Sequence, residues 1–404
     1  MVRRVLFVDD EPNVLEGLRR MLRPLRHEWE MAFASGGPEA LELLDRAAFD
    51  VVVTDMRMPG MDGAQLLAQV RGRHPNLVRI VLTGQSSREA VLRAVRVAHR
   101  QLNKPCDSDE LRTTIQRACA LRDLLADSTL RTLLSRLESV PSPPALYQEV
   151  VKELESAEPS MQKVGEIIGR DTGMTAKILH MVHSAFFGVR FHVASPAQAV
   201  LFLGAETTKA LVLAANIFSK FDAGALKSFA VDAIWAHSQV VGRLAGEVAK
   251  SQWCERRVIE EACMAGLLHD TGKLVLAGYL PDRYGQSLLL ARGGQVPPAE
   301  AERQVFGATH AEVGAYLLGL WGLPDPLVEA VAWHHRPCDC PASTFTPLTA
   351  VHVADALVYE LRVEDGEETA SQLDAAYLAR LGLADRLPAW RELRDAAGRE
   401  GDEP

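Results

Sequence analysis

The feature that most constrains the fold is a fivefold alternation of short apolar stretches with helix-like stretches over the first 105 residues. Val51–Val53 is the clearest apolar stretch, because three successive β-branched residues are typical of a strand buried on both faces. Four further strands are predicted at Val5–Val8, Glu30–Ala34, Ile80–Thr83 and Gln101–Asn103, and helices are predicted from Pro12 and over Pro38–Ala47, Gly63–Arg73 and Glu89–Ala98. Strands that alternate with helices form a parallel sheet with helices on both faces, so the sequence predicts a five-stranded, doubly wound α/β domain.

Polar residues stand where these predicted strands end. Asp9 and Asp10 follow the first strand, Asp55 the third, and Thr83 and Lys104 close the fourth and fifth. All strands of a parallel sheet point the same way, so we expect these residues to meet at the sheet edge where α/β folds bind ligands. Carboxylates crowded together repel one another, and Mg²⁺ relieves the repulsion. We therefore expect Asp55 to attack a phosphoryl donor while Mg²⁺ and Lys104 neutralise the transferring group.

Four motifs around these residues resemble those of a known family. They are Val8-Asp9-Asp10-Glu11-Pro12, Asp55-Met56-Arg57-Met58-Pro59-Gly60-Met61-Asp62-Gly63, Leu82-Thr83-Gly84 and Leu102-Asn103-Lys104-Pro105. Residues 1–121 thus resemble the receiver domain of two-component response regulators. The resemblance implies that Asp55 is the phosphoacceptor, that Asp9, Asp10 and Asp55 bind Mg²⁺, that Thr83 and Lys104 are switch residues, and that a sensor histidine kinase is a partner. Gln101 departs from the family pattern, since receivers often carry an aromatic switch residue there.

A connector is predicted at residues 122–140. Apolar residues at helical spacing run from Ser108 to Val140 without any Pro or Gly between them. Two interpretations are open for this segment. The last receiver helix is followed by a second short helix, or one continuous signalling helix exposes an apolar stripe that pairs with its counterpart in a homodimer.

An all-α domain resembling the HD superfamily is predicted at residues 141–362, with an acidic helical tail at residues 363–404, because strand patterns are almost absent beyond Pro141. Seven polar residues lie on or beside apolar helix faces, namely His237, His269, Asp270, His310, His334, His335 and Asp355. Imidazoles and carboxylates together suit one or two divalent transition metals such as Mn²⁺ or Fe²⁺, which could activate water against a phosphoester. Lys273, one turn beyond Asp270, is a candidate phosphate-binding residue.

The order of these seven residues resembles the motif of the HD superfamily of metal-dependent phosphohydrolases. The front of the domain resembles a different branch, the HDOD domain, which is thought to act mainly as a non-enzymatic interaction module. The matching segments are Leu137–Pro144, Ile167–Leu179, Ser184–Gly188 and Ala199–Gly204. The residues after His335 lack the Gly-Tyr-Pro motif of the cyclic di-GMP hydrolases, so specificity for that substrate is not expected.

Together these features predict a cytoplasmic response regulator that is phosphorylated on Asp55 and relays the signal through its HDOD domain to a downstream signalling protein. The alternative is a phosphorylation-gated metal-dependent phosphohydrolase acting on a nucleotide or cyclic dinucleotide. Neither a secretory signal nor an apolar run near the roughly 20 residues of a membrane span is found, so no membrane association is expected. A net charge of −9 and the lack of a basic recognition helix argue against DNA binding.

Overall fold

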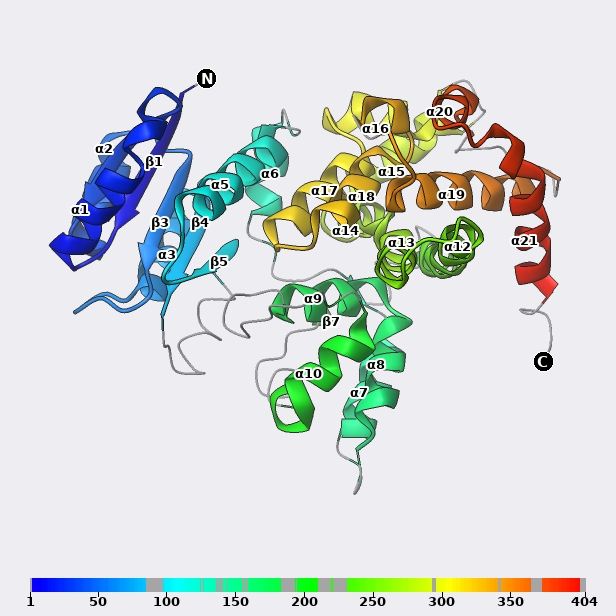
Figure 1. Cartoon of the computed structure of the whole chain (residues 1–404), viewed down its shortest axis with the longest axis horizontal. Helices are drawn as coiled ribbons and strands as arrows, with labels where there is room; N and C mark the ends of the chain where they lie inside the picture. The colour runs from blue at the N-terminus through cyan, green and yellow to red at the C-terminus, as the bar shows by residue number, and fades with distance from the viewer. Residues whose placement is uncertain are drawn as a thin grey trace. The chain divides into compact units, whose positions relative to one another are not determined.

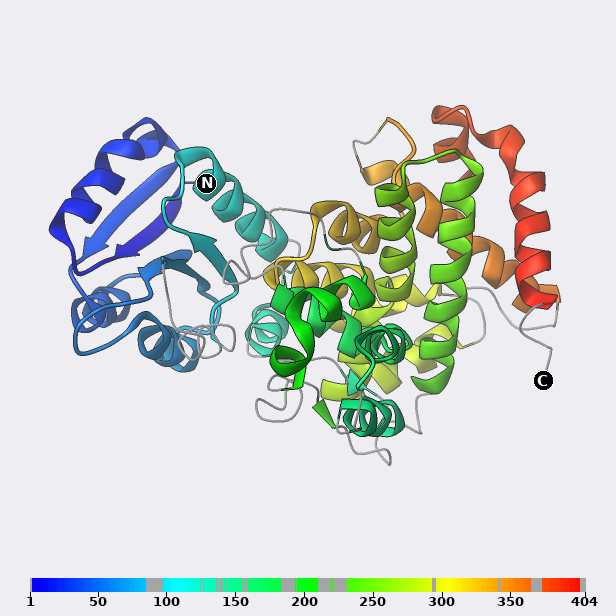
Figure 2. The same ribbon diagram turned by 60° about the horizontal axis from the view of Figure 1, so that its bottom comes forward.

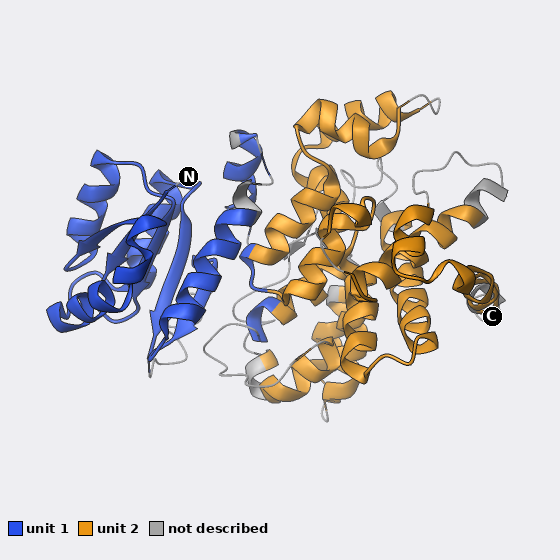
Figure 3. Ribbon diagram, turned by 45° about the horizontal axis from the view of Figure 1, so that its top comes forward, with its two compact units in different colours: residues 1–138, 180–191, 320–322 blue, residues 139–179, 192–319, 323–404 orange. Residues whose placement is uncertain are grey.

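The computed structural model describes residues 2–84, 97–123, 125, 127–135, 137, 141–142, 144–154, 156, 159–182, 193, 195–209, 219–220, 231–292, 296–340, 343–364 and 373–399. The chain forms two compact units (Figure 3). Residues 1–138 make up the body of the first unit, and most of residues 139–404 form the second. Of the predicted segments, Ser184–Gly188 and most of the helix at Glu89–Ala98 lie outside the described residues.

The first unit is built on a five-stranded parallel sheet with the strand order β2-β1-β3-β4-β5 (Figure 1). The strands are β1 (Arg3–Val8), β2 (Trp29–Ala34), β3 (Val51–Asp55), β4 (Val78–Thr83) and β5 (Arg100–Asn103). Every residue of the central strand β3 is buried, as its β-branched sequence predicts. The predicted five-stranded, doubly wound α/β fold is therefore confirmed.

Helices cover both faces of this sheet (Figures 1 and 2). They are α1 (Pro12–Met21), the short η1 (Arg23–His27), α2 (Gly37–Arg46), α3 (Gly63–Arg73) and α5 (Ser108–Asp123). Successive residues of a strand point to opposite faces. Accordingly, Leu6 of β1 packs with Leu66 and Leu67 of α3, whereas Phe7 packs with Leu111 and Ile115 of α5.

The connector contains two helices rather than one. After α5 ends at Asp123, a second helix, α6 (Ser128–Leu134), begins at its own N-cap. The Asp127 carboxylate accepts hydrogen bonds from the backbone N–H groups of Thr129 and Leu130, at 2.7 and 3.2 Å. This cap satisfies donors that a continuous helix would have used internally. The interpretation as two separate helices is therefore confirmed, and that of a continuous helix is wrong.

Five residues of the connector's apolar stripe are buried, whereas Leu133 and Leu137 are partly exposed. Leu111 and Ile115 of α5 and Leu125, Leu130 and Leu134 beyond it are all at most 1% exposed. The prediction of a homodimer assumed that these side chains were available to a second chain. These five side chains are buried within this chain and are not available, whereas the homodimer itself stays a prediction.

The second unit is helical. Its helices are α7 (Pro144–Leu154), α8 (Met161–Gly169), α9 (Thr172–Val182), α10 (Pro196–Lys209), α12 (Val231–Ser251), α13 (Arg256–Leu268), α14 (Thr271–Tyr279), α15 (Pro281–Ala291), α16 (Pro298–Phe306), α17 (His310–Leu320), α18 (Asp325–Trp333), α19 (Pro347–Glu364), α20 (Ala375–Arg380) and α21 (Leu387–Arg399). Two short 3-10 helices, η4 (Pro337–Asp339) and η5 (Ala384–Arg386), and one pair of two-residue strands, β6 (Pro141–Ser142) and β7 (Ser219–Lys220), accompany them. The predicted helical second domain is confirmed. None of the helices in the described residues is long and apolar enough to cross a membrane.

The centre of this unit is a close packing of α12 against α13 and α19. A Cβ atom at Gly266 would lie 2.7 Å from the Cα of Gly242, so the backbones of α12 and α13 touch and only glycine fits there. The predicted C-terminal tail contributes α21, which packs on α12 and α19. Trp390 of α21 is fully buried and donates its indole N–H to the Oγ of Ser251 at 3.0 Å.

Candidate functional sites

The predicted phosphorylation residues of the first unit lie at the carboxyl ends of its strands. Asp55 and Thr83 are the last residues of β3 and β4, and Asp9 and Lys104 directly follow β1 and β5. The Lys104 Nζ lies 2.7 Å from an oxygen of Asp9 and forms an ion pair with Asp55. The Lys104 backbone N–H donates to the Thr83 carbonyl at 2.8 Å. Three of the five predicted residues thus share side-chain contacts, and Asp10, which is partly exposed, is next to them in sequence.

Backbone groups hold both buried carboxylates in place. Asp9 accepts from the N–H of Glu11 at 3.0 Å, and Asp55 accepts from the N–H of Arg57 at 2.5 Å. A Cβ atom at Gly63, the first residue of α3, would lie 2.2 Å from the Asp55 carbonyl oxygen. Glycine at this position therefore allows α3 to begin directly against the end of β3.

The charge of Lys104 is stabilised by its two carboxylate partners. Burial alone would lower the pKa of the ammonium, but the hydrogen bonds and negative charges of Asp55 and Asp9 outweigh this effect and raise it. Lys104 is therefore a permanent cation at the acidic edge. The oxygen donors of Asp9, Asp10 and Asp55 are the ligand type that Mg²⁺ prefers, so this edge fits a magnesium ion.

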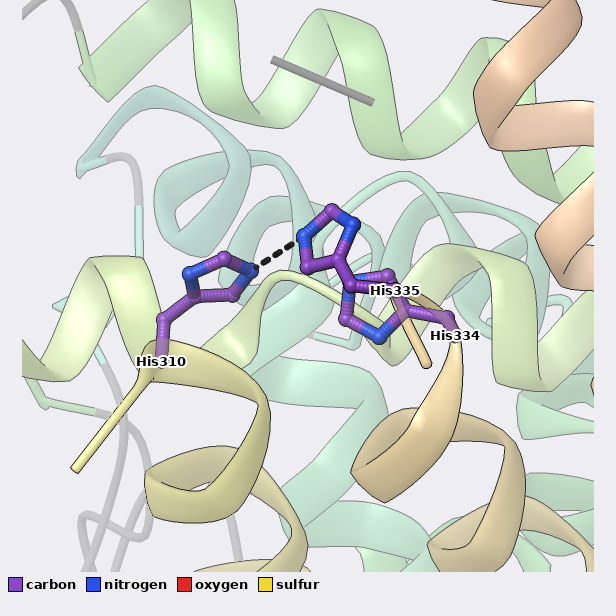
Figure 4. Close-up of side chains that lie close together, drawn as sticks. All are labelled: His310, His334 and His335. Carbon is purple, nitrogen blue, oxygen red and sulfur yellow. Dashed lines mark hydrogen bonds between the residues drawn. The ribbon is translucent and has the colours of Figure 1, made fainter. Parts of the chain in front are cut away.

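The seven predicted residues of the second unit also come together, although they come from five different parts of the chain. His237 lies on α12, His269 and Asp270 lie between α13 and α14, His310 begins α17, His334 and His335 follow α18, and Asp355 lies on α19. Figure 4 shows the three histidines His310, His334 and His335 side by side. We refer to all seven as the histidine–aspartate cluster.

Short contacts link the members of this cluster. An oxygen of Asp355 lies 2.9 Å from the Nε2 of His237 and 3.5 Å from the Nε2 of His269. The other aspartate, Asp270, lies 3.4 Å from the same nitrogen of His269. The Nε2 atoms of His310 and His335 are 3.0 Å apart (Figure 4). Six members are at most 4% exposed, and only the His335 side chain is partly exposed, at 16%.

Several buried polar atoms of the cluster have no hydrogen-bond partner. They are His237 Nδ1, His334 Nε2, Asp355 Oδ2 and Asp270 Oδ1, the last of which lies 3.2 Å from His310 Nε2 without hydrogen-bond geometry. Three sets each bring one ligand atom per residue within 4.8 Å of one another, namely His310–His334–His335, His237–His269–Asp355 and His269–Asp270–His334. Unpaired buried polar atoms are rare in folded proteins, and a bound ion is one of the partners that can satisfy them. The cluster therefore fits one or two divalent transition metals.

The electrostatics of the cluster combine ionised carboxylates with imidazoles in different protonation states. Burial acts to raise the pKa values of Asp270 and Asp355, but the neighbouring histidines, with Lys273 beside Asp270, hold both well below the usual range. Burial, aided by the charges of His335 and His269, lowers the pKa of His334 well below its usual value, so this imidazole is neutral. Burial would lower the pKa values of His269 and His310, but the charge of Asp270 raises the first to about 10 and that of Glu302 raises the second. The cluster thus combines two ionised carboxylates with neutral and protonated imidazoles, and a metal bound there would have to displace the protons of His269 and His310.

Two residues that support the cluster were not predicted. Glu302 of α16, which is 4% exposed, accepts hydrogen bonds from the backbone N–H and the Nδ1 of His310, both at 2.7 Å. The Nδ1 of His352 lies 2.7 Å from the His334 carbonyl. The first contact orients the ring of His310, and the second holds the backbone of His334. His352 lies one helical turn before Asp355 on α19, and no spacing in the sequence marks Glu302 as buried.

Lys273, the candidate phosphate-binding residue, is paired within the cluster. Its ammonium lies 2.8 Å from an oxygen of Asp270, and its side chain is 13% exposed. The positive charge therefore balances the Asp270 carboxylate.

Comparison with known proteins identifies both units. The family model of the response regulator receiver domain matches residues 5–116, and that of the HDOD domain matches residues 140–337.

Individual relatives match parts of the chain. The hydrogenase transcriptional regulatory protein HoxA of Cupriavidus necator is 35% identical over 38% of this chain and 31% of its own length. An uncharacterised protein of Treponema pallidum is 22% identical over 66% of this chain and 50% of its own. The chain thus spans half or less of the length of these curated relatives.

Among solved structures, the MmoQ response regulator of Methylococcus capsulatus superposes with a TM-score of 0.47 at 23% identity, covering 63% of this chain and 98% of that one. The matches to the two family models follow the two units along the chain, the receiver model on the parallel sheet and the HDOD model on the helices. The chain therefore belongs to the response regulators and joins a receiver domain to an HDOD domain.

Proposed function

We propose that Asp55 is the phosphoacceptor of this response regulator and that a sensor histidine kinase supplies the phosphoryl group. The observation that carries the proposal is the convergence of Asp9, Asp55 and Lys104 at one sheet edge. Asp55 has one oxygen on Lys104 and the other on the backbone of Arg57, so its carboxylate is held for attack.

The neighbouring groups have separate roles in this proposal. Asp9, Asp10 and Asp55 would hold Mg²⁺, which supplies positive charge for the transferring phosphoryl oxygens. Lys104 would pair with the phosphoryl group once Asp55 is phosphorylated, because its ammonium already lies between the carboxylates of Asp9 and Asp55. Thr83, at the end of the adjacent strand β4, would hydrogen-bond the new oxygens and act with Lys104 as the switch.

We further propose that the HDOD domain relays the signal by contact with a downstream signalling protein rather than by turnover. The supporting observation is the burial of the histidine–aspartate cluster, in which only His335 is partly exposed. A phosphoester would need an opening to several of these residues at once. A metal in the cluster would then stabilise the packing of α12, α13, α17, α18 and α19 around it.

A second candidate function, metal-dependent phosphoester hydrolysis, is favoured by one specific observation. The ligand set is complete, and several of its buried atoms have no protein partner. A divalent metal held there would lower the pKa of a water molecule and so provide a nucleophile near neutral pH. In this case the Lys273 ammonium would have to leave the Asp270 carboxylate and bind a substrate phosphate.

The phosphorylation proposal is tested with acetyl phosphate as the phosphodonor, with and without Mg²⁺. We expect the wild-type chain to be phosphorylated only with Mg²⁺, and Asp10→Ala to slow this by at least about 100-fold, the scale on which losing one preorganised electrostatic group acts. Intact-mass spectrometry over time gives both rates. Equal phosphorylation with and without Mg²⁺ would contradict the proposed role of Asp9 and Asp10.

A further inference from the structure

Arg79 is a buried charge that the proposed phosphorylation chemistry does not use. It is the second residue of β4, a strand that lies between β3 and β5, and is only 2% exposed. Burying a guanidinium is costly unless hydrogen bonds compensate for lost water. The hydrogen-bond partners of the Arg79 guanidinium therefore indicate its structural role.

The guanidinium binds backbone carbonyls from three separate segments of the first unit. Its Nε donates to the Val97 carbonyl and an Nη donates to the Ser135 carbonyl, both at 2.7 Å. The other Nη lies 3.4 Å from the carbonyls of Pro75 and Leu77, in the loop that leads into β4. Bonds from a charged donor are stronger than neutral ones, and the planar fork of arginine can serve several acceptors at once.

Ser135 connects this network to the connector. It is the C-terminal cap of α6, and its carbonyl lies at the end of the helix that carries partial negative charge. The Thr132 hydroxyl of α6 also donates to the Asn76 side chain at 3.0 Å, and Leu130 and Leu134 are buried. The helix α6 is thus packed on the first unit, although it lies beyond the residues matched by the receiver family model.

Strand β4 carries this network at one end and the proposed switch residue at the other. Arg79 and Thr83 are four residues apart on the same strand, or roughly 13 Å at the rise of a β-strand. The α6 contact therefore lies near the N-terminal end of β4, whereas Asp55 lies at the opposite, C-terminal end of the strands.

We propose that Arg79 anchors the connector helix α6 to the receiver domain. The receiver then moves as one body that includes α6 and extends to Ser135, and it does not end with α5. A change at β4 would therefore move α6 as well. Arg79 is a positioning residue in this role, and the anchor does not depend on whether Asp55 is phosphorylated.

The proposal is tested by amide hydrogen exchange of the full chain, with separate readings for α6 and for strands β1 and β3. We expect Arg79→Met to speed exchange in α6 by about tenfold or more, the scale of one lost hydrogen bond to a charged group, while β1 and β3 stay protected. Arg79→Lys should give a smaller, still selective, increase because it keeps the charge without the fork. Arg112→Met is the matched control, since Arg112 pairs with Glu28 at 2.8 Å on the same unit, and it should leave α6 unchanged.

Each pattern of exchange decides the matter. Wild-type protection of α6 in Arg79→Met would overturn the proposal. If Arg79→Met loses amide protection throughout the first unit, the exchange pattern of Arg79→Lys is used to test the anchor instead. Selective loss in α6 then supports the anchor, whereas uniform loss or no loss overturns it, because Arg79 would then serve only the sheet.

Discussion

Replacing Asp55 with asparagine is expected to reduce phosphorylation of the full chain by acetyl phosphate to background, even at saturating Mg²⁺. The amide keeps the size of the side chain but is not a nucleophile, so the acyl phosphate cannot form. Intact-mass spectrometry, with peptide mapping of the modified residue in the wild type, measures the effect.

Asp62→Asn is the matched control for this substitution. Asp62 lies seven residues later and caps α3 by accepting from the Gln65 N–H at 2.8 Å, a role that asparagine fills nearly as well. The control should be phosphorylated at the wild-type rate. Undiminished labelling of Asp55→Asn would show that another residue is the acceptor.

The second large effect is expected in the histidine–aspartate cluster. The full chain purified with Mn²⁺ or Fe²⁺ should retain bound metal, and His269→Ala should lose it, because His269 belongs to two of the three ligand sets. Glu302→Gln should weaken metal affinity by about 10- to 100-fold, the usual effect of altering the group that orients a ligand histidine. Metal quantification after dialysis, together with a metal titration, measures both.

His74→Ala serves as the control, because this histidine pairs with Asp45 in the other unit and should not change metal content. Thermal unfolding of the same proteins separates metal loss from collapse of the fold. If wild-type chain and His269→Ala both contain no metal, and His269→Ala only loses stability, the cluster is a hydrogen-bonded polar core instead.

The sequence was most informative where one physical rule determines the structure. The β-branched run at Val51–Val53 can only be a buried strand, and parallel strands must bring Asp9, Asp55 and Lys104 to one edge. The helical cluster was predicted as a set of residues, but its contacts depend on how helices cross. Gly242 and Gly266 allow that crossing, and no periodicity reveals it.

Other features were missed because a local pattern pointed the other way. Strand β4 was predicted to begin at Ile80, since a charged residue rarely lies inside a buried strand, yet it begins at Val78 and includes Arg79. The bonds that compensate for this burial come from Val97 and Ser135, which are remote in sequence. The break between α5 and α6 was detectable, because Asp127 is a favourable N-cap residue.

We propose that phosphorylation of Asp55 controls an output domain that acts by contact and not by turnover. The most direct test is the hydrolysis of cyclic dinucleotides and nucleoside phosphates by the Mn²⁺-loaded full chain, phosphorylated and unphosphorylated, with Asp270→Ala measured alongside. We expect that neither state of the wild type hydrolyses these substrates faster than Asp270→Ala does. Rapid hydrolysis that is lost in Asp270→Ala would contradict it and would make this response regulator a metal-dependent phosphohydrolase.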